Sequence, residues 1–231
     1  MNIYGDRGNI ICLTKRMEWR GIKAEVKNLN VGFSEDEIKK CDLLLMGGAQ
    51  DRQQTIVNED LKKKKKTLAD AIEKGLPGLY VCGGFQFLGK YYKEANGTIV
   101  DGLGIFDLYT ENPGENIKRL IGNIAIKPNI EGLKKPIIGF ENHGGRTILG
   151  SKVEPLGKVL KGFGNNEEGF EGAIYKNSFG TYMHGPILPK NSHFADYLIM
   201  LSLNIKDLPP LDDTIEWQAH SAIAKQLQIE I

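Results

Sequence analysis

The stretch LPGLYVCGGFQFLG, residues 76–89, combines a short apolar run, a cysteine and two glycines. The run Leu79–Val81 is strand-like, and the segment Gly84–Tyr92 can wind into a helix. Cys82 is therefore predicted to lie on a sharp turn between a strand and a helix, with its side chain pointing outward. The glycines after it allow the backbone to bend, and amides at a helix start can stabilise a thiolate and bind an oxyanion.

Strand-like and helical segments alternate around this turn. A strand-like run at Leu43–Met46 precedes a polar helix through Leu61 and Ile72. Such alternation is typical of an α/β fold with a mostly parallel central sheet flanked by helices. The whole chain, 1–231, is predicted to form a single domain in which about 205–231 make a C-terminal helical extension. Further strands are expected at 121–126, 136–140, 173–175 and 179–183, and further helices at 192–203 and 214–227.

Composition excludes several classes of protein. The 231 residues are 41% hydrophobic, and 30 basic side chains balance 29 acidic ones, so nothing indicates nucleic-acid binding or stable membrane insertion. No apolar run reaches the roughly 18 residues needed to cross a bilayer, and no signal peptide is evident. The cysteines Cys12, Cys41 and Cys82 lack metal-ligand spacing and cannot all pair with one another. We therefore expect a cytoplasmic protein without a metal site.

Three strand candidates are followed by residues suited to chemistry. Gly47–Asp51 follows the first strand, Cys82 follows Leu79–Val81, and His184 follows the run that ends at Met183. Ligands of open α/β sheets gather beyond the carboxyl ends of the strands. Cys82 and His184 are therefore predicted to meet there and to form a nucleophile pair.

This pair has the chemistry of acyl transfer. A neighbouring imidazole can take the proton of a thiol, so that the thiolate attacks a carbonyl carbon, and can return the proton to a departing amine such as ammonia. The backbone N–H groups of Gly48 and Gly83 are expected to bind the negative oxygen of the tetrahedral intermediate. Each such donor contributes about 3 to 4 kcal/mol in studied cases.

Five motifs in order support a family resemblance. They are the GG-x-x-D loop, the V-C-G-G-x-Q-x-L-G turn, the Y-x-H-G-P strand end, and the segments Tyr4–Asn9 and Gly139–Thr147. Together they resemble class I glutamine amidotransferases of the cobyric-acid-synthase-like branch, and more narrowly the glutaminase (GatD) subunits of lipid II isoglutaminyl synthases. The resemblance implies a flavodoxin-like fold, with Cys82 as the nucleophile and His184 as the base.

The resemblance also implies a substrate, a partner and an arginine. Arg119 falls where an arginine of that family binds the glutamine carboxylate. The partner would be a MurT-type Mur ligase-like subunit in a heterodimer, which uses the ammonia to amidate the α-carboxylate of D-glutamate in the peptidoglycan stem peptide. No cofactor is expected in this chain: it lacks the G-x-x-x-x-G-K-[ST] loop, so ATP and Mg²⁺ would belong to the ligase.

The sequence departs from the class I pattern after the histidine. Many members carry a glutamate two residues later to orient the imidazole, whereas this chain has Pro186 followed by Ile187. We therefore expect no local third member of the triad. The resemblance implies that an aspartate of the partner completes it, and Glu141 is the local alternative. Relatives carry several more residues before Met1, so the chain is expected to begin inside its first strand.

Several readings stay open. The acceptor could be a corrinoid side chain instead, or the chain could be an inactive scaffold for the ligase. Arg119 could be an ordinary strand-edge ion-pair residue, and His143 could either line the site or hold its loop. Asp6 could touch the site or organise the N-terminal loop. The lysines 62–66 are typical of a solvated helix face.

Overall fold

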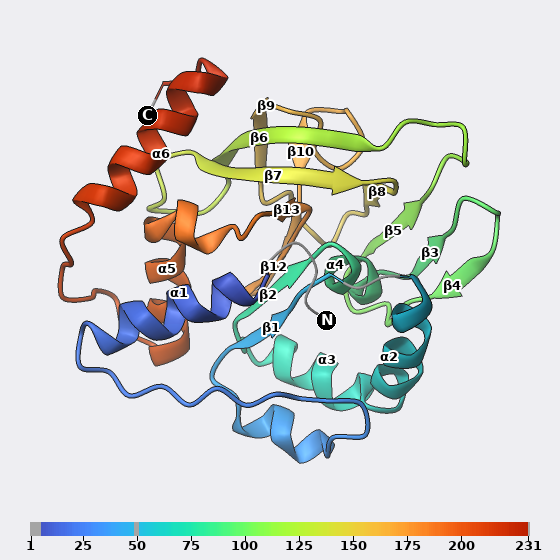
Figure 1. Ribbon diagram of the computed structural model, residues 1–231. Coiled ribbons are helices and arrows are strands. Elements are labelled where there is room, and N and C mark those ends of the chain that lie inside the picture. Colours follow the sequence, from blue (N-terminus) through green and yellow to red (C-terminus); the bar gives the residue numbers. More distant parts are fainter. Residues whose placement is uncertain (1–5, 49–50, 231) are drawn as a thin grey trace.

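A small parallel sheet lies at the centre of the molecule (Figure 1). The computed structural model describes residues 6–48 and 51–230. In the sheet order β1-β2-β12-β11, the first three strands run parallel and β11 is antiparallel. The strands are Leu44–Met46 (β1), Gly78–Val81 (β2), Ala173–Tyr175 (β11) and Ser178–Thr181 (β12).

Helices cover both faces of this sheet. Leu79 and Val81 of β2 pack in one apolar core with residues of α1 and α5, whereas Tyr80 points into a second core with residues of α2 and α3. Alternate side chains of a strand point to opposite faces, so β2 joins the two cores. Within the described residues, no helix combines the length and apolarity needed to cross a membrane. The helices are Arg7–Glu18 (α1), Asp51–Lys63 (α2), Lys65–Glu73 (α3), Gly83–Leu88 (α4), Ser192–Leu203 (α5) and Thr214–Leu227 (α6), with 3₁₀ turns Glu35–Lys40 (η1) and Leu188–Lys190 (η2).

Two further sheets extend the parallel one. A five-stranded antiparallel sheet has the order β10-β9-β6-β7-β13, and a four-stranded mixed sheet has the order β4-β3-β5-β8. Helix α6 packs on β6 and β7 (Figure 1). The strands are Leu120–Pro128 (β6), Ile137–His143 (β7), Gly157–Lys161 (β9), Phe170–Glu171 (β10) and Met183–His184 (β13), then Tyr91–Lys93 (β3), Ile99–Asp101 (β4), Leu108–Glu111 (β5) and Arg146–Leu149 (β8).

The α/β class and its parallel strands are confirmed. The strands predicted at 121–126 and 136–140 pair with each other antiparallel, outside the parallel sheet. Only the short segment 129–136 joins them, and a parallel pair needs a crossover of a dozen residues or more. The helices predicted at 192–203 and 214–227 have the expected bounds.

Three local predictions were wrong. The helix after Cys82 ends at Leu88, and Tyr91 already belongs to β3. The strand predicted at 179–183 is two strands, β12 and β13, which belong to different sheets. The polar helix breaks at Lys64, which is buried, bonds Asp60 at 2.5 Å and lies over the ring of Phe33. The lysine run therefore does not form one solvated face.

A buried arginine ties the N-terminal helix to the C-terminal part of the chain. Arg16 of α1 is 2% exposed and donates four hydrogen bonds of 2.6 to 2.8 Å, two to Asp196 and two to Asp213. Asp196 lies on α5, and Asp213 directly precedes α6. Bidentate pairs of this kind fix orientation as well as charge. They therefore set the position of α1 relative to α5 and α6.

We predict that Arg16→Ala lowers the free energy of unfolding by about 3 kcal/mol, because it leaves the largely buried carboxylate of Asp213 without its cation and leaves Asp196 with Arg20 alone. Urea denaturation followed by circular dichroism measures this change. Lys15→Ala is the matched control: its ion pair with Glu18 is exposed, so a change below about 1 kcal/mol is expected. Equal effects of the two substitutions would contradict the prediction.

Candidate active site

Cys82 sits on the strained turn that the sequence predicts. It follows β2, it is half-buried, and its φ of 53° and ψ of −108° are unusual for a residue with a side chain. Its N–H donates to the carbonyl of Thr181 at 2.8 Å, and its carbonyl accepts the N–H of Gln86 at 2.9 Å. A Cβ on Gly84 would lie 2.6 Å from the carbonyl oxygen of Met46. Only glycine therefore fits the turn against the end of β1.

His184 lies at the end of the neighbouring chain segment. Strand β12 runs parallel to β2 with Thr181 opposite Val81, so both strands end at the same edge. His184 follows three residues later on β13 and is 1% exposed. Its imidazole interacts with the Cys82 thiol. The structure thus brings the two predicted residues together, and their catalytic roles stay predictions.

A local carboxylate also contacts the histidine, and this corrects the expectation that none is present. Asp6 Oδ1 lies 3.4 Å from His184 Nδ1, and the Asp6 side chain is 1% exposed. The other local candidate, Glu141, instead accepts the N–H groups of Phe163 and Gly164. The carboxylate beside His184 is thus distant from it in sequence, and its catalytic role belongs to the proposal below. Whether a partner contributes another acid stays a prediction.

The N-terminal motif is built around this contact. After Asp6, Gly8 packs so closely on Pro186 that a Cβ would lie 2.4 Å from its ring. Asn9 accepts the N–H of Leu188 at 2.9 Å. The segment D-R-G-N thus contacts the His184 ring and the two residues Pro186 and Leu188 that follow it. This motif is the sequence signal that could have identified Asp6. Tyr4, Gly5, Ala49 and Gln50, along with the expected first strand before Asp6, lie outside the described residues.

The surroundings of His184 favour its charged form. Burial alone would lower the pKa of the imidazole, but the hydrogen bonds and negative charges of Asp6 and Cys82 outweigh it and raise the pKa to about 9. The ring is therefore mostly protonated near pH 7. A protonated imidazole stabilises a neighbouring thiolate and is the form that can protonate a leaving amine.

The two expected oxyanion donors have different surroundings. The Gly48 N–H donates to Asp6 Oδ2 at 2.9 Å, so Asp6 links the loop after β1 to His184. Gly83 is the first residue of α4, where backbone N–H groups have no acceptor within the helix. An oxyanion at Gly48 would have to share its N–H with Asp6 or displace the carboxylate. The oxyanion role of both residues stays a prediction.

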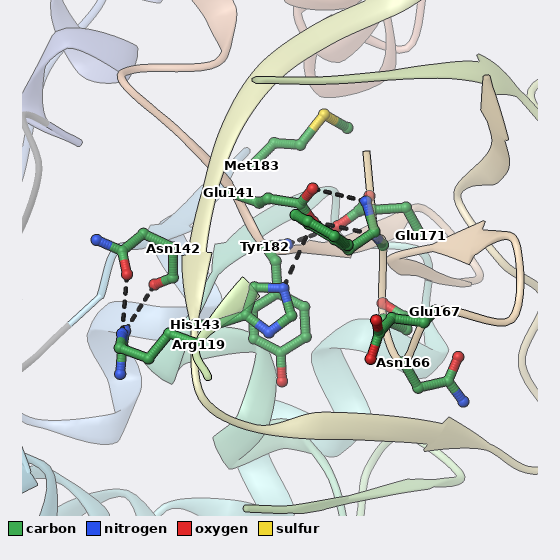
Figure 2. Close-up of polar contacts among 12 residues, drawn as sticks. Arg119, Glu141, Asn142, His143, Asn166, Glu167, Glu171, Tyr182 and Met183 are labelled. Atoms are coloured by element: carbon green, nitrogen blue, oxygen red, sulfur yellow. Dashed lines mark hydrogen bonds and ion pairs between the residues drawn. The ribbon is translucent and has the colours of Figure 1, made fainter. Parts of the chain in front are cut away.

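Arg119 lies directly before β6 and is anchored to β7. Its Nε donates to Asn142 Oδ1 and its Nη2 to the Asn142 carbonyl, both at 2.9 Å (Figure 2). The side chain is exposed, and Nη1 faces Gly144, where a Cβ would lie 3.4 Å away. The contacts described for Arg119 are thus to Asn142, in place of an ion pair at the strand edge. Binding of glutamine by Arg119 stays a prediction.

A buried polar network joins the cysteine turn to the histidine strand. Gln86 of α4 donates to the Tyr182 hydroxyl at 3.1 Å, and this hydroxyl lies 2.6 Å from Thr147 Oγ1. His143 stacks on the Tyr182 ring, 3.7 Å between centroids, and its Nδ1 donates to the Gly145 carbonyl at 2.8 Å (Figure 2). His143 therefore holds its loop against the residues that carry Tyr182.

Comparison with known proteins identifies the family of the chain. The sequence matches the CobB/CobQ-like glutamine amidotransferase domain family over residues 1–192. It is 45% identical to the GatD subunit of the glutamine-hydrolysing lipid II isoglutaminyl synthase of Staphylococcus aureus, over 96% of this chain and 90% of that protein. It is 41% identical to the corresponding subunit of Streptococcus pneumoniae, over 93% of this chain and 83% of that protein.

More distant similarities point in the same direction. A probable cobyric acid synthase of Methanothermobacter thermautotrophicus is 31% identical over 81% of this chain and 38% of that protein. The crystal structure of a glutamine amidotransferase superposes with a TM-score of 0.58 and 17% identity, over 86% of this chain and 94% of that chain, which supports the fold. On the family match and the two GatD relatives, the chain belongs to the CobB/CobQ-like glutamine amidotransferase family.

Proposed function

We propose that the chain is the glutaminase subunit of a lipid II isoglutaminyl synthase. The observation that carries the chemistry is the strained, half-buried Cys82 beside the buried His184 and Asp6. The acceptor is inferred from the 45% identity to the S. aureus subunit over 96% of this chain. In this proposal, the chain hydrolyses glutamine, and its ammonia amidates the D-glutamate α-carboxylate of the peptidoglycan stem peptide to D-isoglutamine.

The proposed reaction uses each member of the site. The Cys82 thiolate attacks the side-chain carboxamide carbon of glutamine while His184 holds the proton. His184 then protonates the departing nitrogen, which leaves as ammonia. The glutamyl group remains on Cys82 as a thioester. Water cleaves the thioester and releases glutamate, so the balance is glutamine and water to glutamate and ammonia. Asp6 fixes the tautomer of the imidazole and stabilises its charged form, the role of the acid in other triads.

The partner and the cofactors belong to the same proposal. The two GatD relatives are named as subunits of a synthase, and we infer a MurT-type ligase that binds ATP and Mg²⁺ and forms a heterodimer with this chain. We also propose a cytoplasmic location, since Cys12, Cys41 and Cys82 are all free thiols, as is usual in a reducing compartment. A corrinoid acceptor is less well supported, because the cobyric acid synthase relative is only 31% identical.

We predict that Cys82→Ser abolishes glutamine-dependent amidation, while supplied ammonium still supports amidation by the complex. The thioester needs the thiolate, whereas the ligase needs only ammonia. Cys12→Ser and Cys41→Ser are the matched controls, because burial raises the pKa of both thiols, that of Cys12 to about 12. Diazo-oxo-norleucine should label Cys82 alone, as read by peptide mass spectrometry. Glutamine-dependent turnover in Cys82→Ser would exclude this nucleophile.

We predict that Asp6→Asn lowers kcat of glutamine hydrolysis by up to about 10⁴-fold, the loss seen when a triad acid becomes an amide. The substitution removes a charge that raises the pKa of His184, so this pKa falls from about 9 toward 6.5, as NMR of the imidazole would detect. Asp36→Asn neutralises an exposed carboxylate and should change neither kcat nor the pKa of His184. An unchanged kcat in the complex with the ligase would mean that the partner supplies the acid.

We predict that Arg119→Lys raises KM for glutamine about 10- to 100-fold with the fold intact. A lysine cannot reproduce a two-pronged contact with a carboxylate, and hydrogen bonds to charged groups contribute about 1.5 to 3 kcal/mol. Arg146→Lys is the matched control, because Arg146 lies nearby but donates to the backbone carbonyls of Gly144 and Lys118. If steady-state kinetics give the same KM for wild type and Arg119→Lys, the arginine does not bind substrate.

A further inference from the structure

The chain changes sheets immediately before His184. Thr181 pairs with Val81 at the end of β12 in the parallel sheet, whereas Met183 pairs with Glu141 in the antiparallel sheet. Tyr182 lies between them and belongs to neither strand. Its buried N–H therefore needs an acceptor from elsewhere, because an unpaired buried amide is costly. The orientation of the His184 side chain depends on the contacts that fix this bend.

A single buried carboxyl group, that of Glu171, holds the bend. Glu171 is 0% exposed, and its Oε1 accepts the Tyr182 N–H at 2.6 Å. The Thr181 hydroxyl lies 3.1 and 3.2 Å from its two oxygens, and that hydroxyl accepts the Met183 N–H at 3.0 Å. Glu171 thus holds Thr181 and Tyr182 directly and Met183 through the Thr181 hydroxyl; Figure 2 shows Glu171 beside Tyr182 and Met183.

Glu171 itself stands where a second segment changes sheets. It ends β10 in the antiparallel sheet, and after Gly172 the chain enters β11 in the parallel sheet. Gly172 has a φ of +67°, and a Cβ there would lie 2.4 Å from the carbonyl oxygen of Gly180. Asn165 holds the Gly172 backbone on both its N–H and its carbonyl. The backbone that carries the Glu171 carboxyl group is therefore fixed in position.

We propose that Glu171, as a neutral carboxylic acid, is a positioning residue that orients His184 toward Cys82 by fixing the bend at 181–183. This inference rests on the proposed role of His184 in glutamine hydrolysis. In the neutral form, Oε1 accepts both the Tyr182 N–H and the Thr181 O–H, and Oε2 carries the acid proton. Thr181 Oγ1 keeps a lone pair that accepts the Met183 N–H.

Glu171 and its neighbour Glu141 differ in the donors that surround them. Glu141 is also 0% exposed, but it accepts two backbone N–H groups, from Phe163 and Gly164, and its Oε2 lies 3.6 Å from His143 Nε2. Among the described residues, Glu171 accepts one backbone N–H, that of Tyr182. A buried carboxyl group with fewer donors and a neighbouring carboxyl group favours its neutral form.

The pKa of Glu171 agrees with this assignment. This pKa is raised to about 8. Burial and the charge of Glu141 raise it, whereas the hydrogen bonds from Tyr182 and Thr181 and the charge of His184 lower it. These are the charged groups that face Glu171 from β7 and β13. Because the folded chain holds this proton up to about pH 8 and an unfolded one releases it near 4.5, this group lowers stability as pH rises between these values.

The first test compares Glu171→Ala with Glu171→Gln in the complex with the ligase. Alanine leaves the Tyr182 N–H unpaired, so kcat for glutamine hydrolysis should fall at least about tenfold while KM changes less than about twofold. Glutamine repeats the bonds of the neutral acid, so its kcat should stay within about threefold of wild type. Asn166→Ala is the matched control: its side chain bonds Glu168 on the exposed turn before β10 and does not hold Glu171, so its kcat should stay near wild type.

The second test reports the proton without relying on activity. The melting temperature of Glu171→Gln relative to wild type should rise between pH 5 and pH 8, because only wild type holds a proton that unfolding releases. In carboxyl NMR of glutamate-labelled protein, wild type should show one signal that titrates near pH 8, and Glu171→Gln should lack this signal. A folded Glu171→Ala with wild-type kcat, a Glu171→Gln as impaired as Glu171→Ala, or a pH-independent difference in melting temperature would each overturn the proposal.

Cys82→Ser separates this inference from the proposed function. If Cys82→Ser keeps glutaminase activity, the proposed function fails and the kinetics of Glu171 variants lose their meaning, whereas the melting experiment still tests the neutral acid. If Cys82→Ser is inactive and Glu171→Ala is fully active, only the positioning role is refuted. The rate at which diazo-oxo-norleucine modifies Cys82 gives the same comparison for the chain without its ligase.

Discussion

The backbone hydrogen bond from the Cys82 N–H to the Thr181 carbonyl, 2.8 Å long, holds the two halves of the candidate site together. It closes the parallel ladder between β2 and β12 at the point where both strands end. Beyond it, one chain turns sharply into α4 and the other bends away toward β13. Cys82 and His184 can face each other because their strands are adjacent and end level, and the rest of the site is arranged around this edge.

Helix α1 supplies the third side of the site. Asp6, at its start, contacts both the His184 ring and the Gly48 N–H, so one carboxylate connects the proposed base with a proposed oxyanion donor. The position of α1 is fixed at its other end by Arg16 and its two aspartates, on α5 and before α6. The C-terminal helices therefore contribute to the geometry of the site through α1.

Charge is distributed unevenly around the histidine. Asp6 lies against the ring and favours its protonated form, whereas Glu171, deeper in the molecule, is held neutral by burial and by the charge of Glu141. The orientation of the imidazole is defined by Asp6 on one side and by the backbone bend on the other. A buried network through Gln86 and Tyr182 links the same bend to the cysteine turn. Rigid support of this kind keeps the proposed nucleophile and the proposed base in reach of each other.

The sequence by itself determined the features that arise from local chemistry. The apolar run and glycines around Cys82 predicted the turn, and the patterns at 192–203 and 214–227 predicted α5 and α6 with correct bounds. Only the tertiary structure decided the rest. The split of the 179–183 strand depends on which sheet each half joins, and the contact of Asp6 with His184 joins residues at opposite ends of the chain. Arg119 likewise meets Asn142 only because β6 and β7 pair antiparallel. Local periodicity carries no information about such contacts, because they depend on how distant segments pack around a shared core.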